Sequence, residues 1–563
     1  MYKPFRRLLT VVALCLCCAS FVSVPTAVAA DGPLPDRWVY IERSLSEDKH
    51  VQEIEDLVTR SAKHGLNGML FASQLDSLDL QNPEFFARLA QVKATCEKNK
   101  IEIIPLVFSA GYGFAVMRHD RNLAEGFLVQ DLPLTVSKGE AIFTQDPGLT
   151  LPNGGLEEFK KDEARGWTFQ DMPGEVSFKD EKVFHSGAAS LRFEHFEKDK
   201  RGRARLFQEI AVKPHRCYVL SFWVKTDKLQ PAGEFEVKVN ADTGRSLVYD
   251  DSRITETADW KEYRFIFNSF DARKITLHMG GAGFKSGSFW IDDCMIAETG
   301  LLNILHRPGA PFTVVGEKNG TTYVEGKDYA PVIDKDLSFK ADHDGLTIKL
   351  LPGSAIQEGE ALKVSYYHGL RLRKGQVSIC MSEPKVYEIW ATQARLMQEK
   401  LGAKTFMLDM DEIRECGTCK SCADRKIAQS ELLGDCITKQ VEILRKASPG
   451  CRVFCWSDML DPNHNCHKDY FMTAGDYTGA WKFVPKDLGI GCWLYDKANE
   501  SLKHFSEGGH PTLAMAYYDA DDTGNSAGWN DLLKKTKGGC GICYTTWENK
   551  YKVLEAFGDL VSK

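Results

Sequence analysis

The stretch RWVYIERSLSEDKHVQEIEDLVTRSAKHGLNGMLFA, residues 37–72, contains one complete strand–helix–strand unit. Two apolar runs have the character of buried strands, and between them lies an amphipathic helix that ends before Gly65. A second helix and a third strand follow. The expected elements are strands at 37–42, 66–72 and 101–109 and helices at 47–63 and 83–98. Strands that alternate with helices predict a parallel sheet with helical crossovers.

From residue 153 to residue 299 the pattern changes to short runs in which apolar and polar residues alternate. Tyr218–Val224 and Phe235–Asn240 are two examples, each bounded by turn residues. Many short alternating strands predict an antiparallel β-sandwich. Residues 300–380 are expected to form a further small β-rich unit, and residues 119–152 a linker.

The strand–helix pattern returns in residues 381–563, where Pro384 opens a helix. Five strand-like runs follow, at 406–410, 452–456, 489–493, 512–517 and 541–547. Three strands in residues 31–118 and five here make eight. The fold class predicted is therefore α/β: a (β/α)8 TIM barrel interrupted after strand 3 by an all-β jelly-roll sandwich and the small β-rich unit. A doubly wound sheet is the alternative, but no glycine-rich phosphate loop follows the first strand.

Residues 1–30 have the features of a secretory signal peptide. Lys3, Arg6 and Arg7 precede a mostly apolar run, and small residues follow it at 27–30. The sequence thus predicts an exported protein, periplasmic or extracellular, with no transmembrane segment after signal removal. Lipid anchoring at Cys17 or Cys18 is the alternative.

Length and charge narrow the class of protein further. A chain of 563 residues is too long for a single core, so several domains are expected. The formal net charge of -7 argues against a nucleic-acid partner, which requires a basic face.

Carboxylates and aromatic residues follow the predicted barrel strands, where the active site of this fold lies. They are Glu42-Arg43, Asp411-Glu412, Trp456-Ser-Asp458, Trp493-Leu-Tyr-Asp496, Tyr517-Tyr-Asp519 and Trp547-Glu548. Aromatic rings stack on sugar rings, and carboxylates bind hydroxyl groups or perform acid–base chemistry. For one strand alone, a core tryptophan or a helix-capping aspartate explains the residues equally well. For five consecutive strand ends, an oligosaccharide or polysaccharide substrate explains them better.

The same strand ends resemble the catalytic domain of family 20 glycoside hydrolases, the β-N-acetylhexosaminidases. The resemblance implies that Glu412 is the general acid/base and that Asp411 orients the 2-acetamido group of the substrate, which acts as the nucleophile. It implies no cofactor for catalysis. Beyond the pair, it implies substrate contacts from Trp456, Trp493 and Trp547 as pocket walls, Tyr517 on the acetamido oxygen and Asp519 on hydroxyl groups; Asp458, Glu548 and Arg43 complete the expected set. Because Glu412 lies beside a second carboxylate, we also expect a raised pKa for it.

The sequence departs from that family at two places. Leu408-Asp409-Met410 stands where the family carries His-x-Gly-Gly, and Glu548 follows Trp547 directly rather than two residues later. Two alternatives therefore stay open. One is a retaining glycosidase in which Asp519, Asp521 or Asp522 is the enzymic nucleophile. The other is a polysaccharide-binding protein without catalytic activity.

The predicted sandwich resembles the jelly-roll carbohydrate-binding modules of bacterial glycosidases. The resemblance lies in the segments 153–158, 166–167, 185–187 and 289–293. It implies a structural Ca²⁺, for which Glu157 and Asp293 are candidate oxygen ligands. Ordinary turn-forming acids are the alternative.

Three cysteines with the spacing Cys416-x-x-Cys419-x-x-Cys422 follow the Asp-Glu pair. They could bind Zn²⁺ with a fourth ligand such as Cys436, or they could form disulfides, which export favours. His464 and His510 lie near strand ends and are interpreted as structural residues.

Overall fold

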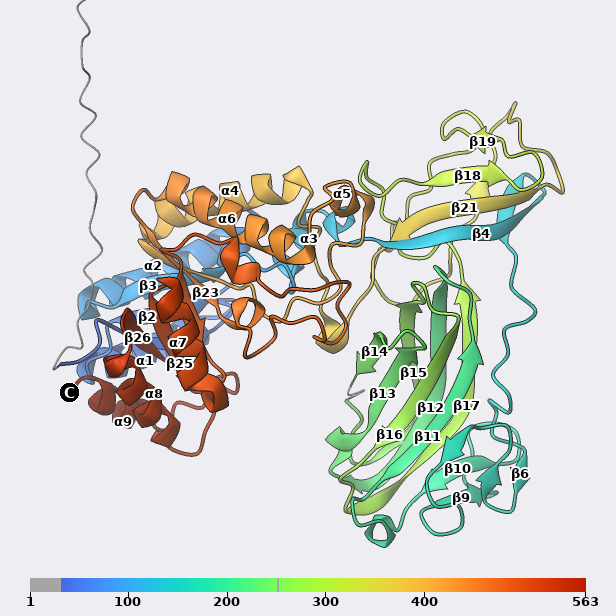
Figure 1. Ribbon diagram of the computed structural model, residues 1–563, viewed down its shortest axis with the longest axis horizontal. Coiled ribbons are helices and arrows are strands. Elements are labelled where there is room, and N and C mark those ends of the chain that lie inside the picture. Colours follow the sequence, from blue (N-terminus) through green and yellow to red (C-terminus); the bar gives the residue numbers. More distant parts are fainter. Residues whose placement is uncertain (1–31, 251–252) are drawn as a thin grey trace, which may run out of the picture.

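The computed structural model describes residues 32–250 and 253–563, so the predicted signal peptide lies outside the described residues. Eight parallel strands form a closed barrel in the order β1-β2-β3-β22-β23-β24-β25-β26 (Figure 1). The strands are β1 (Asp36–Glu42), β2 (Gly68–Ala72), β3 (Glu102–Val107), β22 (Thr405–Leu408), β23 (Arg452–Trp456), β24 (Gly489–Cys492), β25 (Thr512–Tyr517) and β26 (Gly539–Thr545). No helix within the described ranges is both long and apolar enough to cross a membrane.

Helices cover the outside of the barrel, and short helices and turns lie in the loops at its mouth. They are α1 (Asp48–Lys63), α2 (Pro83–Asn99), α3 (Phe114–His119), α4 (Pro384–Leu401), α5 (Lys420–Ala423), α6 (Gln429–Ala447), α7 (Ala498–Gly508), α8 (Gly524–Lys535) and α9 (Leu554–Val561), with the 3-10 turns η1 (Leu75–Leu80), η2 (Arg121–Leu123), η6 (Asp458–Leu460), η7 (Ala480–Lys482) and η8 (Tyr495–Lys497). Their apolar faces and the outward side chains of the strands share one large buried core. Amphipathic periodicity places them there, as the sequence predicts.

The inside of the barrel is filled by large side chains. Trp38, Tyr40, Phe454 and Trp456 lie buried there together with aliphatic and methionine residues. Gly68 makes room for this packing, because a Cβ atom at that position would lie 2.4 Å from the Trp38 ring. An interior packed in this way supports a site only at the mouth of the barrel.

Between β3 and β22 the chain leaves the barrel and builds the rest of the molecule (Figure 1). It first enters a six-stranded sheet, continues into a two-sheet sandwich and then returns through the same six-stranded sheet to α4. The six-stranded sheet has the order β19 (Thr322–Tyr323), β18 (Thr313–Gly316), β21 (Ala361–His368), β4 (Phe127–Ser137), β5 (Glu140–Phe143), β20 (Ile348–Lys349).

The expectation that residues 119–152 form a linker is wrong for most of that segment. β4 pairs along its length with β21, with Ala361 opposite Thr135 and His368 opposite Phe127. Leu132, Leu134 and Val136 are buried because alternate residues of β4 face the sheet's core. The small β-rich unit therefore begins before the sandwich and closes after it.

The sandwich consists of two five-stranded antiparallel sheets around a core of its own. One sheet has the order β15 (Ala258–Asn268), β12 (Cys217–Gln230), β17 (Ser286–Thr299), β10 (Ser190–Phe193), β9 (Ser177–Asp180), and the other β14 (Ser246–Asp250), β13 (Glu236–Ala241), β16 (Lys274–Gly281), β11 (Ala204–Ala211), β8 (Phe169–Gln170). A small hairpin, β6 (Phe159–Lys160) and β7 (Glu163–Ala164), and the 3-10 turns η3 (Phe196–Lys198), η4 (Ala232–Glu234) and η5 (Arg373–Gly375) complete the inserted region. Alternating burial along the strands confirms the predicted period of two.

Candidate active site at the mouth of the barrel

Carboxylates gather at the C-terminal ends of the first, second, fourth and fifth barrel strands. Glu42 ends β1, Asp76 follows β2, and Asp458 follows β23. The loop after β22 contributes Asp409, Asp411 and Glu412. These groups are close enough to act on one another electrostatically, and the pKa of Asp409 is raised by Asp76 and Glu42 as well as by burial. Sequence reasoning missed Asp76 and Asp409, although both follow strands at this rim.

Asp411 is a carboxyl whose surroundings favour the protonated form. Burial raises the pKa of Asp411 well above its usual value, and the neighbouring Asp409, Asp458 and Glu412 raise it further. Its Oδ1 is buried and has no hydrogen-bond partner among residues 32–250 and 253–563. These surroundings favour the protonated form of Asp411, which can act as a proton donor.

Glu412 has the opposite tendency. Burial raises the pKa of Glu412, but the Arg414 guanidinium and a hydrogen bond from Tyr112 outweigh burial and lower it below its usual value. The Tyr112 hydroxyl donates to Oε2 at 2.6 Å, and Arg414 Nη2 lies 3.1 Å from Oε1. The expected raised pKa for Glu412 is wrong, because the sequence did not show these two donors; the raised pKa belongs to Asp411.

The loop that carries this pair is fixed by its backbone. Glu412 has a φ of 45°, and its amide donates to Asp458 Oδ2 at 2.8 Å. Its carbonyl accepts from Gln376 Nε2 at 2.9 Å, a residue of the segment that returns from the inserted region. A non-glycine residue held in a left-handed conformation is locally strained, and such strain is common at functional sites.

Asp409 and Asp458 complete the acidic cluster. Burial, followed by Asp76, raises the pKa of Asp409 to about 7, and Trp456 Nε1 donates to its Oδ1 at 3.2 Å. Burial also raises the pKa of Asp458, whose Oδ2 accepts from Asn465 Nδ2 at 2.9 Å. Asp458 thus positions the Glu412 backbone, a role that differs from the expected direct contact with substrate.

Aromatic rings border the acids, as predicted. Trp493 stacks on Tyr518 with ring centroids 5.5 Å apart and an angle of 7° between the planes. Trp547 is 41% exposed and contacts both Trp456, at 5.8 Å, and Tyr518, at 6.1 Å. Trp456 itself is buried and packs against the more exposed ring of Trp547.

Tyr517 does not reach this site, and its expected role is wrong. The ring is fully buried and stacks on Tyr544 at 4.2 Å in the core outside the barrel. Tyr517, Tyr518 and Asp519 all have positive φ, of 70°, 57° and 60°. This run breaks the alternation of the strand and brings Tyr518 to the rim in place of Tyr517.

Asp519 holds the loop after β26 rather than pointing freely to a sugar. Its carboxylate accepts from Thr546 Oγ1 at 2.5 Å and from the Trp547 amide at 2.7 Å. It also accepts from the Glu548 amide at 3.3 Å. These bonds fix the loop on which Trp547 lies.

The remaining predicted contacts lie at the edge of the site. Arg43 forms an ion pair with Glu53 at 2.7 Å and bonds Asn549, so it ties the loops after β1 and β26 together. Glu548 is exposed and pairs with Lys550 at 2.5 Å.

The two histidines set apart as structural residues have different surroundings. His464 packs on Trp493 with centroids 4.2 Å apart, and its pKa is lowered by burial. His464 therefore lies at the mouth of the barrel, beside the aromatic rings of the candidate site. His510 is buried beside the Leu488 carbonyl, 3.1 Å from its Nδ1.

The sandwich presents a second candidate surface, a row of side chains across the face of one sheet. Cross-strand pairs place Phe169 beside Phe207, Phe207 beside His278, His278 beside Lys238 and Lys238 beside Tyr249. We call these five residues the aromatic row. Phe169 is 41% exposed, and Arg205 lies 5.5 Å from the ring centres of both phenylalanines. Rings and charged groups in a line can bind a glycan chain.

Glu157 and Asp293 come together at one turn of the sandwich, but their oxygens are already bonded to protein donors. Both Glu157 oxygens accept from the Ala188 amide, at 3.1 and 3.0 Å. Asp293 accepts from Ser186 Oγ at 2.9 Å and contacts His185 Nδ1 at 2.6 Å. This arrangement fits a fixed turn better than an oxygen-lined Ca²⁺ site, and the calcium expectation stays a prediction.

The three cysteines after the acid pair do not act together. Cys416 lies 3.0 Å from the Tyr477 hydroxyl, apart from its two neighbours in the motif. Cys419 and Cys422 instead approach Cys380 and Glu125. The expectation that Cys416 and Cys436 belong to one site with them is wrong, and no disulfide occurs within the described part of the chain.

Comparison with known proteins identifies one part of the chain. Residues 152–279 match the family described as "Carbohydrate binding domain". A solved structure titled "CBM4 structure and function" is 17% identical and covers 27% of this chain and 100% of its own, with a TM-score of 0.20. A carbohydrate-binding module in complex with β-1,4-galactotriose is 18% identical over 26% of this chain and 95% of its own, with a TM-score of 0.21.

A rhamnosidase from Novosphingobium sp. PP1Y is 9% identical over 91% of this chain and 55% of its own, with a TM-score of 0.35. No curated protein sequence matches this chain. The resemblance to family 20 glycoside hydrolases therefore stays an interpretation of the strand ends. The chain thus combines a region similar to a carbohydrate-binding domain with a closed parallel eight-stranded barrel, and the family match supports a function related to glycans.

Proposed function

We propose that this chain is an exported glycoside hydrolase that binds a glycan on its sandwich and cleaves a glycosidic bond at the mouth of its barrel. The observation that carries the proposal is the opposite protonation favoured for the adjacent carboxyls of Asp411 and Glu412. Surroundings that move two carboxyl pKa values apart separate an acid from a base. Glycoside hydrolysis requires this combination.

In the proposed reaction, Asp411 donates its proton to the glycosidic oxygen while the bond from that oxygen to the anomeric carbon breaks. The leaving sugar departs as a neutral alcohol. The Glu412 carboxylate stabilises the positive charge that develops on the sugar ring. Water then adds to the anomeric carbon and gives its proton to Glu412, and exchange with solvent restores both groups.

The roles of the two residues are thus exchanged relative to those that the family 20 resemblance implies. If the substrate has a 2-acetamido group, the ionised Glu412 is the carboxylate suited to orient it, because Asp411 is neutral. Trp493, Tyr518 and Trp547 are the rings on which the sugar stacks.

The sandwich joins the barrel close to this site, which suits a glycan that spans both. Tyr249, at the end of the aromatic row, lies under the Arg373 guanidinium at 3.9 Å and beside Phe471 at 5.6 Å. Arg245 forms an ion pair with the buried Glu415, three residues after Glu412. A cleft of about 530 Å³ at this junction is lined by Tyr249, Arg264, Arg371, Arg373 and Lys374 among others.

One of the rival schemes is disfavoured by the contacts of Asp519. Both of its oxygens are bonded to the loop after β26, so it is poorly suited to act as an enzymic nucleophile. Asp521 and Asp522 are exposed and lie with Asp519 on the loop after β25. Their substitution tests the enzymic-nucleophile scheme directly.

A second candidate function is glycan binding without hydrolysis. It is favoured by one observation, namely that the family match covers the sandwich and not the barrel. The decisive experiment is to measure the release of chromophore from a panel of aryl glycosides, with and without a 2-acetamido group. Release that Asp411→Asn abolishes supports hydrolysis; binding of polysaccharide with no release from any member supports the rival.

A further inference from the structure

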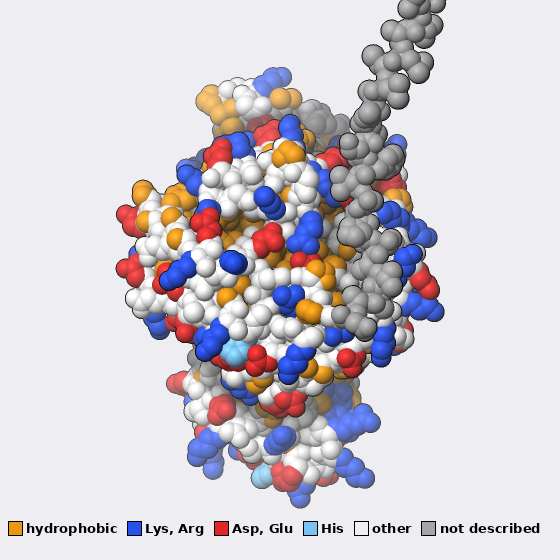
Figure 2. All heavy atoms as spheres, turned by 90° about the vertical axis from the view of Figure 1, so that its left-hand side faces the viewer, with side chains coloured by type: hydrophobic (Ala, Val, Ile, Leu, Met, Phe, Trp, Pro, Cys, Tyr) orange, Lys and Arg blue, Asp and Glu red, His pale blue; other side chains and the backbone are white. Residues whose placement is uncertain are grey.

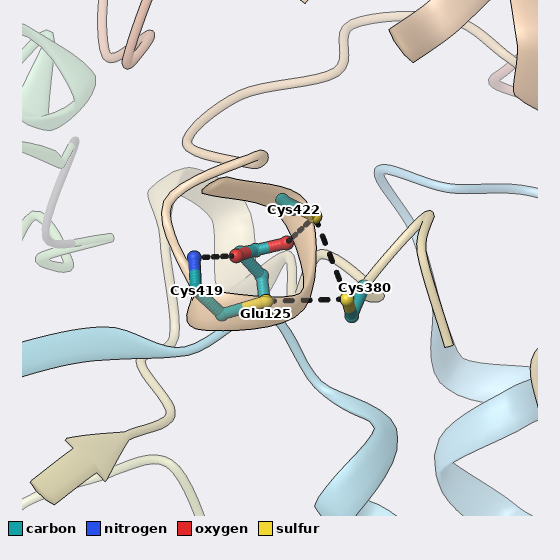
Figure 3. A group of neighbouring side chains, drawn as sticks. All are labelled: Glu125, Cys380, Cys419 and Cys422. Carbon is teal, nitrogen blue, oxygen red and sulfur yellow. Dashed lines mark hydrogen bonds between the residues drawn. The ribbon is translucent and has the colours of Figure 1, made fainter. Parts of the chain in front are cut away.

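Four buried side chains that take no part in the proposed reaction converge outside the barrel mouth (Figure 3). They are Glu125, Cys380, Cys419 and Cys422, and one ligand atom from each lies within 4.8 Å of the others. Cys380 Sγ is 3.3 Å from Cys419 Sγ and 3.6 Å from Cys422 Sγ, and Cys422 Sγ is 3.8 Å from Glu125 Oε2.

The carboxylate of Glu125 is oriented by the loop that carries two of the sulfurs. Oε1 accepts from the Thr418 amide at 3.0 Å and from the Cys419 amide at 2.7 Å. Oε2 is left to face the sulfurs, as Figure 3 shows. Such outer hydrogen bonds are what fixes a carboxylate as a metal ligand.

A buried cation accompanies the cluster. Arg307 interacts electrostatically with Cys380 and Cys419, donates to the Ala124 carbonyl at 3.0 Å and forms an ion pair with Glu383. Three thiolates and a carboxylate around a divalent cation leave a net charge of about −2. The positive charge of the Arg307 guanidinium offsets part of it.

The donor set and its spacing select the metal. Thiolates favour Zn²⁺, which in structural sites has four tetrahedral ligands with Zn–S distances of about 2.3 Å, and these imply sulfur–sulfur distances of about 3.8 Å. The separations of Cys380 Sγ from Cys419 Sγ and Cys422 Sγ, 3.3 and 3.6 Å, are about 0.5 and 0.2 Å shorter than that value. A disulfide would use only two of the three sulfurs and would leave a thiol and a carboxyl buried beside it. We propose that Glu125, Cys380, Cys419 and Cys422 form a structural zinc site.

The site lies at the neck where the inserted region leaves and re-enters the barrel. Here the outgoing and returning segments pair, with the Glu125 amide donating to the Ser378 carbonyl at 2.7 Å and the Cys380 amide to the Leu123 carbonyl at 2.9 Å. Zinc would join both segments to the loop after β22. Ser378 Oγ also donates to the Arg414 carbonyl at 2.6 Å, so this cross-link lies next to the loop that holds Glu412.

The test is the zinc content of the purified full-length chain, measured by mass spectrometry of the metal after dialysis. We expect about one Zn²⁺ per wild-type chain, and at least a fivefold lower content in Cys419→Ser. Cys416→Ser is the matched control, because Cys416 belongs to the same motif but lies against Tyr477; this variant should keep the metal. Replacement by Co²⁺ should give a thiolate-to-cobalt charge-transfer band, which reports the sulfur ligands without any substitution.

Three results would overturn the proposal. The first is wild-type protein without zinc in which peptide mapping finds a disulfide among Cys380, Cys419 and Cys422. The second is equal zinc content in Cys419→Ser and wild type. The third is Co²⁺ bound without a thiolate band. Because the cobalt band is measured on the wild type, the proposal can still be tested if Cys419→Ser fails to fold. None of these readouts depends on hydrolysis, so failure of the zinc proposal and failure of the proposed function can be told apart.

Discussion

The mouth of the barrel and the face of the sandwich both offer aromatic rings, but they differ in what surrounds those rings. At the mouth, the rings border a cluster of buried carboxyl groups whose pKa values are shifted in opposite directions. On the sandwich, the aromatic row includes Lys238 and lies beside Arg205, and these two cations pair with Glu236 and Asp171. Burial together with specific charged and hydrogen-bonding neighbours gives acids the shifted pKa values that catalysis needs, whereas an open row of rings is sufficient for binding.

The largest effect expected is that of Asp411→Asn on hydrolysis. Without the proton donor, kcat should fall by roughly 10²–10⁴-fold on a confirmed substrate, the usual contribution of a general acid. Asp521→Asn is the control, because Asp521 is an exposed carboxylate on the loop after β25. A large loss in the control and none in Asp411→Asn would transfer the chemistry to the enzymic-nucleophile scheme.

Asp409 gives the barrel a pH dependence opposite in sign to that of the sandwich face, where burial lowers the pKa of His278 to about 4. Its pKa is raised to about 7, above the ordinary value of about 3.9 for an aspartate, so the folded chain retains a proton that the unfolded chain has lost. This stabilisation is complete below the ordinary value and is lost as pH rises towards 7.

Asp409→Asn should therefore reduce the fall in the free energy of unfolding between pH 5 and pH 8, by on the order of 2 kcal/mol. Denaturant unfolding at the two pH values measures the difference. Asp521→Asn, with its exposed carboxyl, should leave the wild-type difference unchanged. Identical pH dependence in Asp409→Asn and wild type would show that this carboxyl does not bind a proton in the folded state.

The aromatic row should affect binding of a long glycan and leave cleavage of a small substrate unchanged. Phe207→Ala is expected to weaken polysaccharide binding about fivefold, since a stacked ring contributes on the order of 1 kcal/mol. Affinity electrophoresis measures this loss. Trp260→Ala, on a strand of the other sheet, is the control. Loss of binding in the control alone would place the glycan on the opposite face.

The smallest effect is expected for Tyr518, and it distinguishes this residue from the adjacent Tyr517. Tyr518→Phe should raise KM a few-fold, because the Tyr518 hydroxyl interacts electrostatically with Asp411, Asp458 and Glu412. Tyr517→Phe should leave KM unchanged because Tyr517 packs on Tyr544. Steady-state kinetics on one aryl glycoside is sufficient. A higher KM in Tyr517→Phe alone would restore the assignment made from sequence.

The architecture could be predicted because it depends on hydrophobic periodicity, which the chain shows clearly in Asp48–Lys63 and Pro384–Leu401. The pairing of Phe127–Ser137 with Ala361–His368 could not, because pairing of strands so far apart in sequence leaves no local signal. The assignment of acid and base failed for a similar reason. Tyr112 and Arg414 decide the charge of Glu412, and only the folded chain brings Tyr112 to it.

The arrangement of charged side chains on the surface could not be predicted from the sequence either. Figure 2 shows Lys and Arg interspersed with Asp and Glu over one face of the molecule, with no single basic region there. Net charge could be read from the sequence, whereas the position of each charge required the fold. The acids that matter here are the few that burial and neighbours have changed.

The central claim, that Asp411 is the acid and Glu412 the charged partner, is tested most directly by the dependence of rate on the leaving group. Wild type, Asp411→Asn and Glu412→Gln should be compared on two aryl glycosides of the same sugar, one with a good and one with a poor leaving group. A good leaving group needs no proton, so the defect of Asp411→Asn should shrink on it by on the order of tenfold or more, while that of Glu412→Gln stays the same. The reverse pattern, with rescue of Glu412→Gln and not of Asp411→Asn, would contradict the assignment.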